Sequence, residues 1–123
     1  MTNTEALQFA QEWIANFNRR DAAQVLRHFA DNATFRSPKG AAFCGKTVFN
    51  SREELAAYWT GGLQAISTLH FTLDHVINDV EARSVAILYE AEINGVRERA
   101  AEVYRFDEHS KVISGEALYG APL

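Results

Sequence analysis

Apolar residues in the first half of the chain recur at helical spacing and predict three helices. The first stripe consists of Ala6, Phe9, Ala10, Trp13, Ile14 and Phe17, and the second of Ala22, Val25, Leu26, Phe29 and Ala30. The third stripe consists of Leu55, Tyr58, Trp59, Gly62, Leu63 and Ile66. A residue that can cap a helix precedes each stripe, at Thr2, Asp21 and Ser51, which supports three separate helix starts.

The remaining pattern predicts strands. Between the second and third helices, "DNATFRS" predicts a short strand that Pro38 halts, and a loop follows over residues 39–50. After Ser67 the apolar period changes to two in "TLHFTLDHVI", "SVAILYEAEI", "RERAAEVYRF" and "KVISGEALYG". The short joins between these four segments favour antiparallel neighbours. The order of elements predicts one α+β domain over residues 1–123, with three N-terminal helices on one face of a curved, mostly antiparallel sheet.

Composition and charge narrow the functional classes. Hydrophobic residues make up 47% of the chain and the formal net charge is −4, so nucleic acid is not expected as a partner. No secretory signal and no membrane-spanning run is visible, and the single cysteine, Cys44, cannot form an internal disulfide. These features favour a cytoplasmic protein without a membrane partner. No metal-ligand spacing or phosphate-binding glycine loop is present, so no cofactor is expected.

One carboxylate stands on an otherwise apolar strand face. Ala100, Glu102, Tyr104 and Phe106 alternate along one face of the third long strand, which we expect to point into the core. A buried carboxylate must be hydrogen-bonded or take up a proton. Glu102 can therefore be a general acid or a neutral hydrogen-bond donor. It can equally be a structural residue that pairs with an arginine or histidine on a neighbouring strand.

The histidines offer one possible partner for Glu102. His70 alternates with apolar neighbours in "LHFTLDH", and on the mixed face it can meet Glu102 across a cavity and titrate near neutrality. The other interpretation is that His70 is a satisfied structural residue. His28, placed on the second helix, and His109, in the "DEHS" turn, are expected to be exposed.

Many aromatic residues fall on the predicted inner faces. They are Trp13, Phe17, Phe29, Phe35, Tyr58, Trp59, Tyr89, Tyr104 and Tyr119. They can form a bulky core, but rings with polar tips around one carboxylate favour an apolar pocket with a few polar anchors. A second apolar set is assigned to the convex outer face of the sheet, and it predicts a homodimer through that face. This set consists of Leu69, Phe71, Leu73, Ala101 and Val103.

The whole chain resembles the nuclear transport factor 2-like superfamily, in its SnoaL-like and ketosteroid isomerase-like branch. The segment "WIANFNRRDAAQVLRHFADNATFRSP" resembles the first two helices and first strand of that family. "SREELAAYWTGGL" resembles its third helix, and "EVYRFDEHSKVISGEALYG" its closing hairpin. The resemblance implies a cone-shaped α+β barrel with a pocket at its wide end, usually in a homodimer.

The resemblance also implies roles for three positions. Ser37 stands where ketosteroid isomerases carry the aspartate base, and Trp13 stands where they carry a tyrosine that donates to the substrate oxyanion. Glu102 falls at the position of their second donor, a protonated aspartate. A serine hydroxyl without an activating partner cannot remove a proton from carbon. Steroid isomerisation by that mechanism is therefore not expected.

Two functions remain open from the sequence. The first is an isomerase, cyclase or hydratase for a small steroid-, terpenoid- or polyketide-like molecule, with Glu102 and His70 as catalytic residues. Its substrate-binding residues would be Trp13, Phe17, Phe35, Ser37, Trp59, Tyr89, Tyr104 and Tyr119. The second is a non-catalytic ligand-binding or dimeric partner protein, which the missing base favours.

Overall fold

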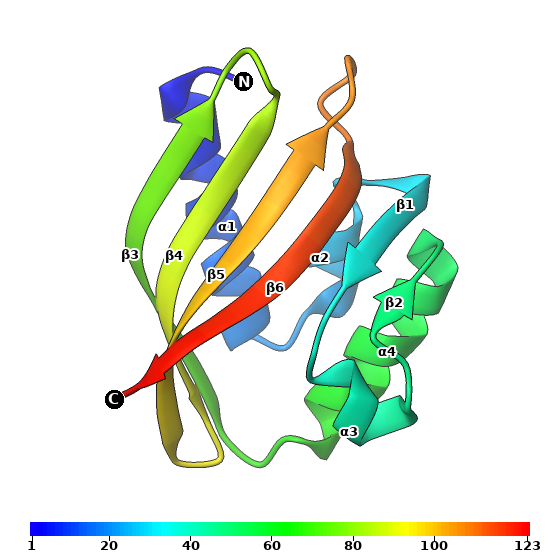
Figure 1. Ribbon diagram of the computed structural model, residues 1–123, viewed down its shortest axis with the longest axis vertical. Helices are drawn as coiled ribbons and strands as arrows, with labels where there is room; N and C mark the ends of the chain where they lie inside the picture. Colours follow the sequence, from blue (N-terminus) through cyan, green and yellow to red (C-terminus); the bar gives the residue numbers. More distant parts are fainter.

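Six strands form one curved sheet, and the helices cover one of its faces (Figure 1). The computed structural model describes residues 1–123. The helices are α1 (Asn3–Asn18), α2 (Ala22–Leu26), α3 (Gly40–Cys44) and α4 (Arg52–Ala65). The strands are β1 (Phe29–Arg36), β2 (Val48–Phe49), β3 (Leu69–Asp79), β4 (Ser84–Ile93), β5 (Val96–Phe106) and β6 (Val112–Pro122). The expected α+β class is confirmed, and none of the helices has the length and apolar composition needed to cross a membrane.

The sheet is mostly antiparallel and stays open. Its strand order is β2-β1-β6-β5-β4-β3, so the two edge strands, β2 and β3, do not pair with each other. Short turns join β3 to β4, β4 to β5 and β5 to β6, and these neighbours are antiparallel as expected. β1 runs parallel to β6, which is possible because α3, β2, α4 and three further strands separate them in the chain.

Three local expectations are wrong. Phe29 and Ala30 begin β1 instead of ending the second helix, because Phe29 pairs with Val112 of β6. The residue before them, His28, was expected to be exposed, but it lies in a turn with its side chain 30% exposed, since its ring packs edge-on against Phe9 at 5.6 Å between centroids. The loop over residues 39–50 also contains the short helix α3, which ends at Gly45 with φ of 77°, and the strand β2.

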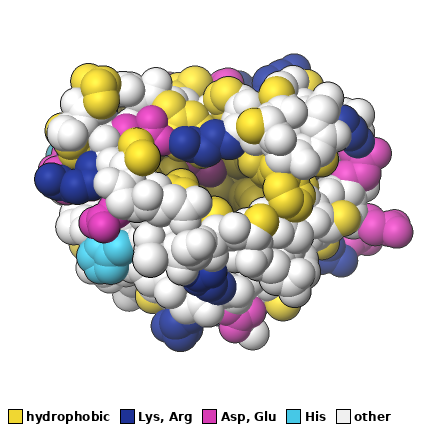
Figure 2. Space-filling model, turned by 90° about the horizontal axis from the view of Figure 1, so that it is seen from below, with side chains coloured by type: hydrophobic (Ala, Val, Ile, Leu, Met, Phe, Trp, Pro, Cys, Tyr) yellow, Lys and Arg dark blue, Asp and Glu magenta, His cyan; other side chains and the backbone are white.

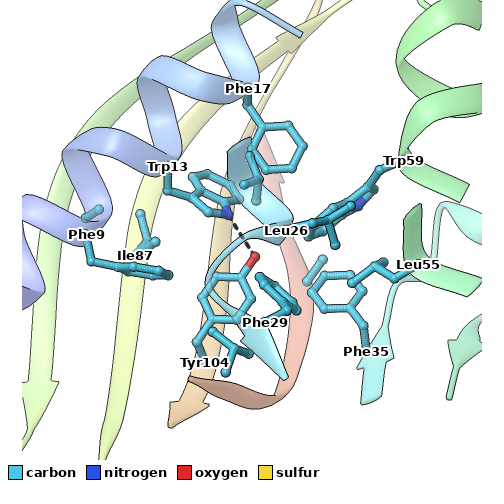
Figure 3. Packing of buried hydrophobic residues seen from close by; sticks show 14 of the residues in the cluster. Phe9, Trp13, Phe17, Leu26, Phe29, Phe35, Leu55, Trp59, Ile87 and Tyr104 are labelled. Atoms are coloured by element: carbon cyan, nitrogen blue, oxygen red, sulfur yellow. Dashed lines mark hydrogen bonds between the residues drawn. The ribbon is translucent and has the colours of Figure 1, made fainter. Parts of the chain in front are cut away.

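The core lies between α1, α4 and the inner face of the sheet. Trp13 on α1 donates its Nε1–H to the Tyr104 hydroxyl on β5 at 2.8 Å, and both side chains are buried (Figure 3). Asn18, at the end of α1, accepts from the backbone N–H of Phe71 at 2.7 Å and donates to its carbonyl at 2.9 Å. These bonds hold α1 against the edge strand β3 and satisfy backbone groups that would otherwise be unpaired at that edge.

Leu69, Phe71 and Leu73 of β3 point inward, so their assignment to the outer face is wrong. Phe71 is 7% exposed, and its ring stacks on Trp13 at 5.7 Å between centroids. Leu69 and Leu73 share its face and pack against the same core. Alternation shows which residues share a face, but the docking of α1 decides which face becomes the inner one. Ala101 and Val103 lie opposite the buried face of β5, as expected.

Candidate functional site

A cavity of about 330 Å³ opens between the sheet, α3 and α4, and its wall is mostly apolar. Figure 2 shows this hollow with hydrophobic side chains at its wall. Seven elements supply its aromatic lining: Phe17 from α1, Phe35 from β1, Phe43 from α3, Tyr58 and Trp59 from α4, Phe71 from β3, Tyr89 from β4 and Tyr119 from β6. The volume lies in the range of small-molecule sites. The cavity therefore has the size and chemistry of a site for a small apolar molecule.

Glu102 is the one carboxyl group in the cavity wall. It sits in the middle of β5 and is 4% exposed, with Ile87 and Ala117 as its cross-strand neighbours. Its hydrogen-bond partner is Tyr89, whose hydroxyl donates to Oε2 at 3.0 Å. The alternative that Glu102 pairs with an arginine or histidine is wrong, since both neighbouring strands place apolar residues beside it.

Burial controls the charge of this carboxyl. It raises the pKa of Glu102 to about 8, although the hydrogen bond from Tyr89 lowers it somewhat. The carboxyl is therefore mostly protonated at pH 7. Because Tyr89 occupies Oε2, the other carboxyl oxygen can carry the proton and donate it to a group in the cavity. Burial, followed by the nearby Glu102, also raises the pKa of Tyr89, which stays a neutral donor.

A second polar pair lies elsewhere on the cavity wall. Ser37 follows the end of β1 and is 3% exposed, and its hydroxyl lies 3.0 Å from that of Tyr58 on α4. The Tyr58 ring stacks on Phe49 with 4.5 Å between centroids, and burial raises the pKa of its hydroxyl. No carboxylate or imidazole forms a hydrogen bond with the Ser37 hydroxyl. The pair therefore offers neutral hydroxyl groups and no activated nucleophile or base.

The one cation in the cavity wall comes from the loop after β1. The Lys39 ammonium lies 2.6 Å from Glu98 Oε1 and 4.3 Å from the centroid of the Tyr119 ring. Burial raises the pKa of Tyr119, with the nearby Glu102 carboxyl as the next cause. Lys39 is thus paired with a carboxylate and stacked on an aromatic ring. The groups that face the cavity are mainly neutral hydrogen-bond donors on an apolar wall.

Most of the predicted site residues meet at this cavity. Those in its wall are Phe17, Phe35, Ser37, Trp59, Tyr89, Glu102 and Tyr119. Trp13 and Tyr104 do not line it, because they lie behind the wall and satisfy each other by a hydrogen bond. The donor role that the resemblance implies for the Trp13 indole therefore does not fit, since its N–H is already used.

The expected meeting of His70 with Glu102 is wrong. His70 is exposed on the outer face of β3, beside Thr72, whose hydroxyl lies 3.4 Å from its Nδ1. The inner positions of this strand belong to Leu69 and Phe71, both of which line the cavity. No histidine therefore faces Glu102.

Several residues of the cavity wall were not among the predicted site residues, although Tyr58 was one of the aromatic residues that favoured a pocket. Tyr58 and Gly62 belong to the apolar stripe of α4, and that stripe was the available signal for both. Lys39 and Phe43 come from the loop and from α3, where no periodic pattern indicates which side chains turn inward.

Comparison with known proteins identifies the family. The SnoaL-like domain family model matches residues 10–114. A SnoaL-like protein of unknown function from Burkholderia thailandensis is 32% identical, with a TM-score of 0.86 over 98% of both chains. A steroid delta-isomerase from Pseudomonas aeruginosa shares the fold at 19% identity and a TM-score of 0.70, over 94% of this chain and 80% of that one.

A further solved structure with this fold is an epoxide hydrolase/cyclase-like enzyme, SalBIII, described for pyran ring formation in polyether salinomycin. It is 21% identical, with a TM-score of 0.74 over 95% of this chain and 92% of that one. No curated protein matches the chain in sequence. The family match spans most of the chain, and the protein belongs to the SnoaL-like domain family.

Proposed function

We propose that the protein is an enzyme that binds a small, largely apolar molecule in this cavity and acts on it by acid catalysis. The observation that carries the proposal is the Glu102 carboxyl, which burial keeps neutral against an aromatic wall. The substrate class that fits is a steroid-, terpenoid- or polyketide-like molecule with a carbonyl or epoxide oxygen. The isomerase and the cyclase-like enzyme that share the fold support this class.

The proposed chemistry uses Glu102 as the acid. Its free carboxyl oxygen donates a proton to the substrate oxygen, where negative charge develops in the transition state, and the water-poor wall strengthens that interaction. Tyr89 stabilises the carboxylate that remains through its bond to Oε2. A hydroxyl or water that adds to the activated carbon then loses its own proton to that carboxylate. The cycle restores the starting acid and needs no second carboxylate.

The reaction type follows from the groups around the cavity. Removal of a proton from carbon needs a base, and Ser37 with its Tyr58 partner does not supply one. Cyclisation, hydration or ring opening is therefore preferred over the isomerisation carried out by an aspartate base. In these reactions, transfer of a proton to oxygen is the step that the enzyme must assist.

The pH dependence of ligand binding tests the role of Glu102. The probe is 1-tetralone, a neutral two-ring ketone, titrated calorimetrically against wild type and Glu102→Gln between pH 7 and pH 9. Because only the protonated carboxyl donates, wild-type affinity should fall about tenfold over this range. The glutamine amide donates at every pH, so the variant should bind with constant affinity. A wild-type affinity that does not change with pH, or no binding at all, would remove Glu102 from this role.

A non-catalytic ligand-binding protein is the second candidate, and the lack of a base in the cavity favours it. The discriminating experiment incubates the protein with a hydroxy-epoxide that can close to a pyran ring and follows the products by proton NMR, because the ring and its precursor are isomers of the same mass. An enzyme should form the ring faster than Glu102→Gln does. If the protein only binds the compound, wild type and Glu102→Gln should both show ring closure at the slow uncatalysed rate.

We also propose a homodimer through the outer face of the sheet. Leu88, Ala101 and Leu118 lie side by side across β4, β5 and β6, and Leu118 is 48% exposed. The neighbouring row contains Ile77, Ala86 and Val103. Two ion pairs flank these rows, Asp74 with Arg99 and Glu90 with Arg97, so the surrounding surface carries both positive and negative side chains. A surface with an apolar centre and both charges can face a second copy of itself across a two-fold axis.

A further inference from the structure

Two adjacent glycines lie inside α4, where glycine is unfavourable relative to alanine. Gly61 and Gly62 occupy the third turn of this helix. A positive φ does not explain them, since among the glycines only Gly45 and Gly95 have one. The presence of glycine at each position must therefore be explained by the space around its Cα.

Gly61 provides room for a contact within the protein. A Cβ added there would lie 3.0 Å from the tip of the Phe43 ring, which α3 places over this part of α4. Phe43 also packs on Tyr58, with 6.0 Å between ring centroids, and lines the cavity. The absent side chain of Gly61 thus lets α3 approach α4 at the cavity wall.

Gly62 has no such neighbour. A Cβ added there would meet no atom within 4 Å, although Gly62 lines the cavity. It stands one turn after Tyr58 and one turn before Ile66, and both of these also line the cavity. Side chains spaced by four residues share one face of a helix. The row is therefore interrupted at Gly62, and the missing side chain leaves open space between two cavity-lining residues.

We propose that Gly62 determines the size of the substrate, by leaving room in the wall for the body of a flat multi-ring molecule. This inference rests on the proposed function, because it concerns the same cavity. The substrate would carry its oxygen to Glu102 and extend its rings past Gly62, between Tyr58 and Ile66. A methyl group at position 62 would occupy this space and meet no protein atom within 4 Å, so alanine there should disfavour large ligands and still admit small ones.

The test compares Gly62→Ala and Gly62→Leu with wild type, using two neutral ketones of different size. The probes are 1-tetralone, with two rings, and androst-4-ene-3,17-dione, with four. Gly62→Ala should weaken binding of the steroid about tenfold, the usual effect of one methyl group in an apolar site, and Gly62→Leu should abolish it. Affinity for 1-tetralone should change less than about threefold in Gly62→Ala.

Thr60→Ala is the matched control. Thr60 is exposed on the far side of α4, and alanine is the better helix former at both positions. Both alanine variants should therefore unfold at a higher urea concentration than wild type, while Thr60→Ala should bind both ketones as wild type does. If Gly62→Ala unfolds at a lower urea concentration than wild type, the inference that the space at this position is open would be wrong.

The outcomes separate this inference from the function on which it rests. If wild type binds the steroid and Gly62→Leu binds it equally well, Gly62 does not set substrate size, and the proposed function stands. If Gly62→Ala weakens the binding of both ketones to the same extent, Gly62 does not discriminate between ligands by size. If wild type binds neither ketone, the proposed function fails and this inference fails with it.

Discussion

The free energy of unfolding should depend on pH through Glu102. Burial raises the pKa of this carboxyl from 4.5 to about 8 in the folded protein, while the unfolded chain exposes it to water. Between these two values the folded protein holds a proton that the unfolded chain has released. The stability that Glu102 contributes is therefore fully present below pH 4.5 and is lost as the pH rises to about 8.

The magnitude follows from the number of protons released. One proton bound by the folded state alone changes the free energy of unfolding by about 1.4 kcal/mol per pH unit. Between pH 5.5 and pH 7.5 wild type should therefore lose about 2–3 kcal/mol relative to a protein with a neutral, non-titrating side chain at this position. Glu102→Gln is that protein, because the amide has nearly the same shape and can accept the hydrogen bond from Tyr89.

The assay is urea unfolding of wild type and Glu102→Gln at pH 5.5, 6.5 and 7.5. Burial lowers the pKa of His28, so its contribution to stability is lost as the pH falls through its unfolded value, which gives a slope of opposite sign. Both proteins contain His28, and the difference between them removes its effect. As the pH rises, the free energy of unfolding of wild type should fall relative to that of Glu102→Gln. A difference that stays constant would show that the carboxyl has an ordinary pKa and would refute the reasoning.

Two further predictions concern the core and the outer face. Tyr104→Phe leaves the buried Trp13 Nε1–H without its acceptor and should cost about 1–3 kcal/mol of unfolding free energy. Affinity for 1-tetralone should not change, because neither side chain lines the cavity; unchanged stability would contradict the role of this pair. Wild type should sediment as a dimer at micromolar concentration and Leu118→Lys as a monomer, whereas Val80→Lys, at an exposed turn, should leave the dimer intact. A monomeric wild type would rule out the proposed interface.

The capped helices and the long strands could be predicted from the sequence, because several local signals agree there. At α1 the Thr2 and Glu5 side chains both bond across the first turn, and the apolar stripe from Ala6 to Phe17 lies on the core. Glu102 could be predicted for a similar reason. A carboxylate at a regular inner position of a strand is visible in the alternation itself.

The errors arise where a pattern permits two structures. The spacing from Val25 to Phe29 suits a helix, but pairing of Phe29 with β6 makes that residue part of a strand. The alternation in β3 groups Phe71 with its neighbours and separates it from His70, yet only the docking of α1 decides which group is inside. Both choices depend on contacts between distant parts of the chain, which local periodicity does not contain.

The cavity itself could be predicted only in part. Aromatic residues with polar tips indicated an apolar pocket, but Trp13 and Tyr104 use their polar atoms on each other and not on the cavity. Gly62 belonged to a recognised stripe, and nothing in the sequence separates a glycine that leaves open space from one that permits close contact. That difference appears only when the surrounding atoms are in place.

The most direct test of the central claim is an NMR titration of the Glu102 side-chain carboxyl. Protein labelled with ¹³C at the glutamate carboxyl carbons would be followed from pH 4 to pH 10, and the signal that disappears in Glu102→Gln assigns Glu102. We predict a midpoint near 8, which means a neutral acid facing the cavity at pH 7. A midpoint near the ordinary value of 4.5 would mean a charged carboxylate and would contradict the proposed acid catalysis.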